Sequence, residues 1–312
     1  MTATIAPPPG GTAPPEPNPE WWLGEPSTSP RRRVVNAIAT TWMIGAVTLA
    51  LVPLGLILSY VVIKGSSIVS WSFLSNNLPI VTQFPGGGIW PAIGGTIFVT
   101  AIAALMAVPL GVLAAIYLNE YGRQRALARV IRFMADVMTG VPSIVMGLFV
   151  AMIWVSSGAH QGYSTFAGSL ALACLMLPIV IRSTEEMLKR VPDDLRQASD
   201  ALGARRSRTV SRVVIPAALP GIVSGSMLAV ARAAGETAPL LFTIFGTQRA
   251  LQTNVFHGTN TTLSVVIWQN AQQPFAAAQD RAWGAGLTLI ALVFLFTMLA
   301  RFVSARFSTL ET

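Results

Sequence analysis

Six long apolar segments, separated by polar and charged stretches, occupy most of the chain. A membrane-spanning helix needs about 20 mostly apolar residues, and each segment is of that order. Internal proline and glycine do not exclude a helix in a membrane bundle, because neighbouring helices re-satisfy the backbone. The pattern therefore predicts an all-α membrane protein with six transmembrane helices, over about residues 34–63, 90–118, 133–155, 166–187, 217–245 and 283–302.

Small residues and a proline interrupt two of these segments. Pro178 lies inside the fourth segment, and Gly221 and Gly225 lie four residues apart in the fifth. The glycine spacing lets two helix backbones approach closely. Incidental glycines would give the same pattern, so the spacing alone leaves both interpretations open.

The first 33 residues form a separate region that is rich in proline and glycine. Residues 1–30 carry no basic region and no apolar core, so nothing marks them as a cleaved signal peptide. A segment of this composition cannot bury enough apolar surface to order itself. We expect a disordered cytoplasmic tail over 1–33, a transmembrane domain over 34–305 and a short cytoplasmic C-terminus over 306–312.

Composition agrees with a membrane protein. The chain is 53% hydrophobic and 11% charged, whereas soluble domains carry about 25% charged residues. The net charge of +8 does not indicate a nucleic-acid partner, because the basic residues accompany long apolar runs. In membrane proteins such an excess usually marks the cytoplasmic surface.

Basic residues predict the orientation. Sixteen of the 21 Lys and Arg residues fall on one side of the predicted bundle and three on the other, while Arg182 and Arg232 lie within predicted helices. Cytoplasmic loops carry the basic excess, so both termini and both basic loops should be cytoplasmic, and the stretches 65–89 and 246–280 should be outer loops. The sixteen are Arg31, Arg32, Arg33, Arg123, Arg125, Arg129, Arg132, Lys189, Arg190, Arg196, Arg205, Arg206, Arg208, Arg212, Arg301 and Arg306.

The sequence lacks common nucleotide-binding and catalytic motifs. It contains no G-x-x-x-x-G-K-[ST] and no H-E-x-x-H, and no G-x-S-x-G. The acidic residues at membrane depth are Asp136, Glu185, Glu186 and Glu236, and the first three lie near cytoplasmic helix ends, where water can solvate them. We expect that this chain is not an enzyme.

Metal-binding patterns are also absent from the sequence. Cys174 is the single cysteine, and His160 and His257 are too far apart in sequence to suggest a ligand pair. We expect no metal and no cofactor on this chain.

The long cytoplasmic loop at about 190–216 carries the first family resemblance. It reads Gln197-Ala198-Ser199-Asp200-Ala201-Leu202-Gly203 and closes with Val213-Val214-Ile215-Pro216. This resembles the E-A-A-x-x-x-G…I-x-L-P loop of bacterial ABC importer permeases, in which a short helix–turn–helix docks in a cleft of the ATPase subunit. Gly203 and Pro216 match in identity and spacing, whereas the Glu is replaced by Gln197 and the second Ala by Ser199.

The residues of this loop fit a docking role on physical grounds. Leu195, Ala198, Ala201 and Leu202 recur at helical spacing and give an apolar face. Gly203 then supplies a turn where a side chain would obstruct. The alternative is an amphipathic helix that lies on the lipid surface.

A second resemblance narrows the substrate. The run Ala231–Phe242, which contains R-A-A-G-E-T-A-P-L-L, closely resembles the R-A-x-G-E-T-A-P segment of phosphate-specific transporter permeases. The segments Gly140–Gly147 and Leu177–Glu185 look like that family too, and A-P-L-L fits its A-type rather than its C-type permease. The resemblance covers about residues 34–305 and implies a type I ABC importer permease fold in the bacterial cytoplasmic (inner) membrane.

The resemblance also implies partners. They are a C-type permease in a heterodimer, two ATPase subunits that carry ATP-Mg, an extracytoplasmic phosphate-binding protein and membrane lipid. A permease for another oxyanion, such as sulfate or molybdate, is the main alternative function. A membrane scaffold and an intramembrane enzyme are further alternatives, which the docking loop and the missing catalytic motifs disfavour.

The candidate substrate pathway centres on Arg232 and Glu236. Arg232 lies 16 residues beyond Pro216, or about 24 Å along an ideal helix, which places it well inside the bilayer. Glu236 is one helical turn further on the same face, and it either neutralises Arg232 or shares an anion site with it. Thr237 is a further candidate, and Arg182 either joins the pathway or snorkels to the cytoplasmic surface.

The orientation is testable by cysteine labelling in intact cells, in a Cys174→Ala background. Cysteine at Ser207 should be shielded from an impermeant thiol reagent, because the basic excess puts that loop in the cytoplasm. Cysteine at Thr259 should be labelled. Labelling at Ser207 would overturn the orientation.

Overall fold

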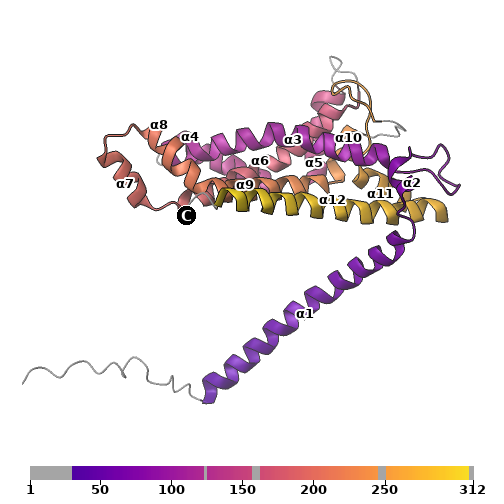
Figure 1. The fold of residues 1–312 in the computed structure, drawn as a ribbon, viewed down its shortest axis with the longest axis horizontal. Helices are drawn as coiled ribbons and strands as arrows, with labels where there is room; N and C mark the ends of the chain where they lie inside the picture. Colours follow the sequence, from indigo (N-terminus) through magenta and orange to yellow (C-terminus); the bar gives the residue numbers. More distant parts are fainter. Residues whose placement is uncertain (1–29, 123–124, 157–161, 245–250, 309–312) are drawn as a thin grey trace, which may run out of the picture. The chain divides into compact units, whose positions relative to one another are not determined.

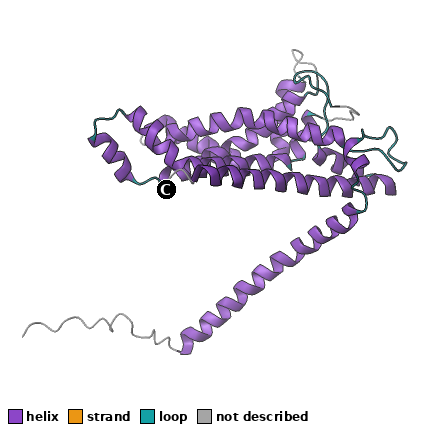
Figure 2. Ribbon diagram, in the orientation of Figure 1, coloured by secondary structure: helices purple, strands orange, loops and turns teal. Residues whose placement is uncertain are grey.

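The computed structural model describes residues 30–122, 125–156, 162–244 and 251–308. The chain divides into two compact units, Met1–Leu58 and Ser59–Thr312. Helices make up nearly all the regular structure of the described residues (Figure 2), and the β-type pairing among them is one isolated bridge between Ser164 and Gly258. The predicted all-α class is confirmed.

The first helix, α1, covers Pro30–Ser66 and crosses the boundary between the units. It begins earlier than expected, so the predicted tail 1–33 is wrong at residues 30–33, which form the first helical turn. Residues 1–29 lie outside the described part of the chain. Large apolar side chains along α1, such as Trp42, Leu49 and Leu56, are exposed, as suits a surface that meets lipid or another subunit.

Four long helices form the body of the second unit. They are α3 (Trp90–Ile116), α6 (Thr165–Arg190), α9 (Ile215–Ala234) and α12 (Ala276–Ser308). Figure 1 shows them side by side, with the short helices α7 (Asp193–Ala201) and α8 (Arg206–Thr209) at one end and α2 (Trp71–Ser75) at the other. The last helix runs past residue 305, so the predicted C-terminal tail 306–312 begins as helix.

Small residues bring these helices close together. Alanines of α3 and α9 are buried against larger side chains of α6, such as Leu172 and Met176. A Cβ atom added to Gly225 would lie 2.7 Å from Cβ of Ser183, and one added to Gly221 would lie 2.6 Å from Cγ of Met187. The close helix approach that the glycine spacing permits is therefore present, between α9 and α6.

The third predicted span is not one straight helix. It consists of α4 (Ala126–Gly140), α5 (Ser143–Val150) and a π-helical turn, η3 (Ala151–Val155), with a bend of 107° at the break. Pro142 ends the first piece because proline disfavours helical backbone in the residue before it. Among the described residues, five helices are long and apolar enough to cross a membrane, or six if this bent pair counts as one span.

The fifth predicted span is also interrupted. It starts with α8 (Arg206–Thr209) and the π-helical turn η4 (Val210–Val214), continues through α9 and ends at Ala234. Gly235 follows as the C-cap, and a separate short helix, α10, covers Ala238–Thr243. The predicted continuous helix over 217–245 is therefore wrong, because Gly235 and Pro239 break it.

A buried helix lies in the stretch that the sequence suggested as a polar outer loop. Helix α11 covers Leu263–Ala271, and Thr262 caps it by accepting a hydrogen bond from the backbone N–H of Val265. Leu263, Val265 and Val266 are buried. The loop prediction was wrong here because polar Gln and Asn residues surround a short apolar run.

The close packing of α9 on α6 predicts that Gly225→Val destabilises the protein. Overpacking of this kind costs about 1–3 kcal/mol, and a lower midpoint of thermal unfolding in detergent would report it. Gly45→Val in α1 is a matched control, because no atom lies within 4 Å of the added Cβ. Equal midpoints for the two variants would contradict the tight α6–α9 contact.

Candidate anion site and coupling loop

A cavity of about 200 Å³ opens where α9 ends. Three parts of the fold meet around it: the α4–α5 break, the middle of α6 and the last turn of α9. Its lining residues are Met138, Thr139, Val141, Ser143, Leu175, Met176, Pro178, Ile179, Ala229, Arg232, Ala233 and Glu236. The two predicted pathway residues Arg232 and Glu236 therefore share one cavity.

Arg232 and Glu236 form a loose ion pair in this cavity. Nε of Arg232 lies 3.8 Å from Oε1 of Glu236, and their side chains are 70% and 24% exposed. The α-helix ends between them, so a cap at Gly235 rather than one continuous helical face holds them together. A separation of 3.8 Å is too long for a hydrogen bond. Each group therefore remains able to bind a ligand.

The other two predicted pathway residues do not line the cavity as the structure describes it. Thr237 is the N-cap of α10, and its carbonyl oxygen accepts hydrogen bonds from the backbone N–H groups of Leu240 and Leu241. Arg182 pairs with Asp136 of α4 through Nη2 and Oδ1. The structure thus gives Arg182 a carboxylate partner, and neither residue of this pair lines the cavity.

Two hydroxyl groups in the cavity were not predicted. Ser143 is the first residue of α5, and the hydroxyl of Thr139 donates a hydrogen bond of 2.6 Å to the carbonyl oxygen of Asp136. Both come from the break in the third span. A Gly-Val-Pro-Ser run inside an apolar segment was the available signal, but serine and threonine are too common for the residue types alone to mark a site.

Two contacts hold the broken helices next to the cavity. A Cβ atom added to Gly147 of α5 would lie 2.9 Å from the carbonyl oxygen of Pro239 in α10, so these short helices touch at that glycine. The hydroxyl of Ser264, in α11, donates a hydrogen bond of 2.9 Å to the carbonyl oxygen of Glu236. Sequence reasoning missed Ser264 because it lies 28 residues beyond Glu236.

The predicted coupling loop folds as a helix and a tight turn. Helix α7 covers Asp193–Ala201, and Gly203 follows with φ +74°. The N–H of Gly203 donates to the carbonyl of Asp200, and that of Ala204 donates to the carbonyl of Ser199. These two bonds make a Schellman motif, in which glycine avoids the strain of the left-handed backbone. No atom lies within 4 Å of a Cβ added to Gly203.

Helix α7 presents its apolar face to the outside. Leu202 is 88% exposed, and Leu195, Ala198 and Ala201 are exposed as well. Gln197 is also exposed, while Ser199 faces inward and its hydroxyl lies 2.9 Å from that of Thr209. Pro216 is the second residue of α9. The loop thus offers an unpartnered apolar surface within the described chain.

Comparison with known proteins identifies the family of the chain. The model of the family "Binding-protein-dependent transport system inner membrane component" matches residues 107–309. The phosphate transport system permease protein PstA 1 of Mycobacterium tuberculosis (strain CDC 1551 / Oshkosh) is 44% identical over 282 residues, 88% of this chain and 91% of that protein. PstA of Yersinia pestis is 41% identical over 280 residues, 88% and 92% of the two chains.

The chain belongs to the PstA permease family. It is a multi-pass inner membrane protein, as the apolar segments predicted.

Solved structures show the same fold. A chain of the inward-facing MetNI methionine ABC transporter is 19% identical to this permease with a TM-score of 0.53, and the match covers 72% of this chain and 94% of that one. A chain of a bacterial ABC transporter that imports alginate is 16% identical with a TM-score of 0.59, over 88% and 99%. The type I ABC importer permease fold is therefore confirmed.

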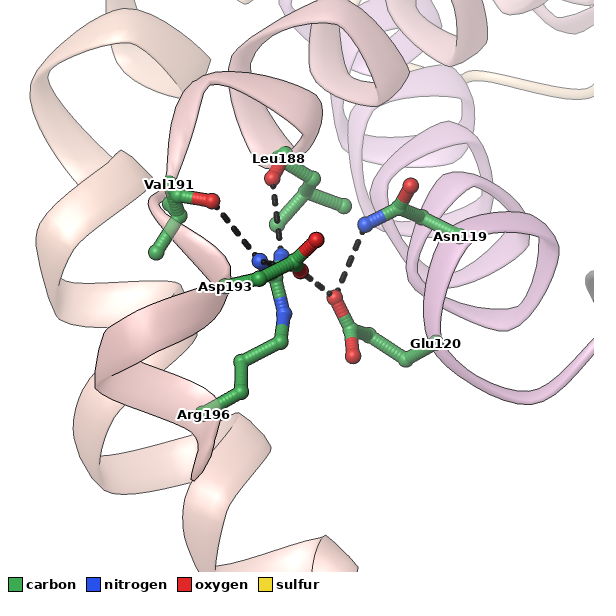
Figure 3. A network of polar contacts seen from close by, with 6 residues as sticks. All are labelled: Asn119, Glu120, Leu188, Val191, Asp193 and Arg196. Atoms are coloured by element: carbon green, nitrogen blue, oxygen red, sulfur yellow. Dashed lines mark hydrogen bonds and ion pairs between the residues drawn. The ribbon is translucent and has the colours of Figure 1, made fainter. Parts of the chain in front are cut away.

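A buried polar network connects α7 to the bundle of this permease (Figure 3). Arg196, in α7, lies within hydrogen-bonding distance of Glu120, which follows α3, and of carbonyl oxygens at the end of α6. Both Arg196 and Glu120 are largely buried. The sequence suggested a solvated basic loop, and this cluster went unpredicted because its partners are far apart in the chain.

A second ionic cluster corrects the expectation that Glu185 is solvated. Its side chain is 2% exposed, and Oε1 lies 3.0 Å from Nε of Arg132 and 2.9 Å from Nζ of Lys189. Nη2 of Arg132 also donates to the carbonyl oxygen of Leu118. Glu185 therefore joins α4 to α6 inside the cytoplasmic end of the permease.

Proposed function

We propose that this chain is the A-type permease subunit of an ATP-driven phosphate importer, and that Arg232 and Glu236 form part of its anion site. The observation that carries the proposal is the shared cavity: a guanidinium and a carboxylate line it together, at the point where α9 breaks. The PstA relatives, whose names describe phosphate transport system permeases, support phosphate as the substrate.

An arginine at this depth needs a compensating role. Placing one near the centre of a bilayer costs at least about 2.5–3.5 kcal/mol on insertion scales, and such residues usually line a substrate path. Neutralisation by Glu236 alone is the competing explanation. The 3.8 Å separation and the 70% exposure of the Arg232 side chain favour an anion site, because the guanidinium of Arg232 can still form hydrogen bonds to a ligand.

The two groups suit phosphate better than sulfate. A guanidinium binds two oxygens of a tetrahedral anion side by side, and the ion pair with Glu236 involves Nε of Arg232 rather than its terminal nitrogens. An ionised Glu236 accepts a hydrogen bond from the proton of phosphate, which sulfate lacks at neutral pH. A site built around such a donor rejects the analogue without it.

Helix breaks at the cavity supply further polar groups. Ser143, at the start of α5, places a hydroxyl and the positive end of a helix dipole beside the cavity. Transporter sites commonly use broken helices in this way. In this proposal Arg232 binds the charge, Glu236 selects the protonated anion, and Ser143 adds a donor.

The remaining parts of the importer lie on other chains. The sequence has no G-x-x-x-x-G-K-[ST] motif, so ATP-Mg belongs on two ATPase subunits, and this chain binds no cofactor. The exposed apolar face of α7 is the docking surface that we assign to one ATPase. A C-type permease completes the pathway in a heterodimer, and an extracytoplasmic phosphate-binding protein delivers the anion.

The anion site predicts the effect of charge removal. Arg232→Gln should abolish phosphate uptake by the reconstituted transporter, because it removes the positive charge from the cavity while the subunits still assemble. Glu236→Gln should weaken uptake or uncouple ATP hydrolysis from it. Phosphate-stimulated ATP hydrolysis, with sulfate as comparison, measures both effects.

Arg182→Gln is the matched control for this prediction. It removes another arginine from a predicted span, but one that pairs with Asp136 and does not line the cavity. Uptake should therefore survive better than in Arg232→Gln. Near-normal uptake in Arg232→Gln would leave the self-neutralising pair as the better account, and equal stimulation by sulfate would argue for another oxyanion.

The coupling loop predicts a different pair of phenotypes. Gly203→Asp introduces a charge at the docking turn, where burial without a partner costs several kcal/mol, and adds about 1–2 kcal/mol of strain at positive φ. Transport and copurification of the ATPase should fall. Because nothing in the permease itself lies near the added Cβ, the protein should still insert.

Gln197→Ala is the companion variant. Gln197 replaces the family's Glu and carries no charge, so its removal should have a mild effect on transport. Complete loss of transport in Gln197→Ala, or normal transport in Gly203→Asp, would show that the contact has been misplaced.

A further inference from the structure

Arg196 joins three elements with one side chain. Its Nη2 donates to Oε1 of Glu120 and to the carbonyl oxygen of Leu188, each at 3.0 Å. Its Nη1 donates to the carbonyl oxygen of Val191 at 2.7 Å and to Oδ1 of Asp193 at 3.0 Å. Figure 3 shows the guanidinium between these acceptors. The contacts come from α7, the end of α6 and the turn after α3.

The contacts with α6 satisfy groups that a helix end leaves unpaired. The last carbonyl groups of an α-helix have no partner within the helix. Helix α6 ends at Arg190 with Val191 as its C-cap, so Leu188 and Val191 contribute two of the last carbonyls. A cation there also opposes the negative end of the helix dipole. Arg196 therefore caps α6 from the neighbouring helix.

The contact with Glu120 fixes α7 to the other side of the bundle. Glu120 belongs to the π-helical turn η2 (Tyr117–Tyr121), which directly follows α3. Its Oε1 also accepts a hydrogen bond of 2.8 Å from Nδ2 of Asn119. The side chains of Arg196 and Glu120 are 13% and 4% exposed. An ion pair shielded this well is screened by salt far less than a surface pair.

The two faces of α7 are therefore different. Arg196 and Ser199 have partners in the permease, whereas Leu195, Ala198 and Leu202, on the adjoining face, are exposed. Helix α6, which Arg196 caps, continues without a break to Met176 and Pro178 in the cavity wall. One rigid element thus connects the docking surface with the cavity.

We propose that Arg196 is the positioning residue that makes α7 one mechanical body with the ends of α3 and α6. This inference rests on the proposed function: when an ATPase partner displaces α7, the displacement reaches the cavity wall through α6. Without the Arg196 contacts, the loop between α6 and α7 deforms, and the displacement of α7 does not reach the cavity wall. Uptake then no longer follows ATP hydrolysis, although the docking face of α7 is intact.

A distance measurement tests the mechanical part without reference to substrate. Spin labels at the exposed positions Glu186 and Asp200, in a Cys174→Ala background of the full transporter, report the separation of α6 and α7. Arg196→Gln and Glu120→Gln should broaden the distance distribution. Asp193→Asn should leave it narrow, because Asp193 is 65% exposed and Arg196 keeps its buried acceptors. An unchanged distribution in Arg196→Gln overturns the proposal.

A coupling measurement tests the functional part. Arg196→Gln should lower the phosphate imported per ATP by about tenfold, the scale on which mutations along a coupling path act, while the ATPase still copurifies. Arg196→Lys should recover part of this ratio. Lysine keeps the positive charge that pairs with Glu120, but it lacks the planar guanidinium that donates to several acceptors at once. An unchanged ratio, or loss of the ATPase from the complex in proportion to activity, overturns the proposal.

The two measurements separate this inference from the proposed function. If the unmodified transporter imports no phosphate, the function is wrong, and the distance distributions still decide whether Arg196 fixes α7. If phosphate import is normal but Arg196→Gln changes neither distance nor ratio, the positioning role alone is wrong.

Discussion

Lipid offers no hydrogen bonds to a polypeptide backbone, and this constraint explains where the helices of this permease break. Irregular backbone at membrane depth is tolerated where protein surrounds it or where it lines a cavity. Both breaks, at Pro142 and at Gly235, adjoin the cavity that contains Arg232. At the second break, the backbone carbonyl oxygen of Glu236 accepts a hydrogen bond from the hydroxyl of Ser264. The proposed anion site thus lies where irregular backbone and polar groups are tolerated.

Charge at the cytoplasmic end serves a different purpose. There, buried carboxylates of Glu120 and Glu185 hold arginines that reach across from other elements. Removing one partner from such a cluster leaves an uncompensated buried charge, which is costly. The clusters therefore fix the ends of α3, α4 and α6 relative to α7. Under the proposals made above, ion-paired packing at this end would transmit motion and the helix breaks at the cavity would bind the anion.

The sequence predicted what depends on long, uniform patterns. Runs of about 20 apolar residues are conspicuous, as are Arg232 and Glu236 inside one of them, so the spans and the two candidate residues that share the cavity followed directly. The bend at Pro142 did not follow, because proline inside an apolar run is compatible with a continuous membrane helix. Whether Pro142 breaks the helix or lies within a continuous one depends on the residues that pack around it in the folded protein.

The sequence could not predict the roles of residues that depend on tertiary contacts. Arg196 reads as one more basic residue in a cytoplasmic loop, and its partner Glu120 lies 76 positions away. Ser264 lies in a short helix with too few apolar residues to stand out from a polar loop. Loop turns were more predictable, since a glycine at a helix end has a local reason to be there, as Gly203 shows.

Helix α1 has a consequence for the membrane around the permease. It contains 37 residues, about 55 Å of helix, whereas the hydrocarbon layer is about 30 Å thick. Its apolar stretch from Val34 to Ile63 is also longer than that layer requires. A helix of this length meets hydrophobic mismatch, which is relieved by tilting, by bending at Pro53 or by thickening the surrounding bilayer. The acyl-chain length of the host membrane therefore becomes a variable that acts on this subunit through its first helix.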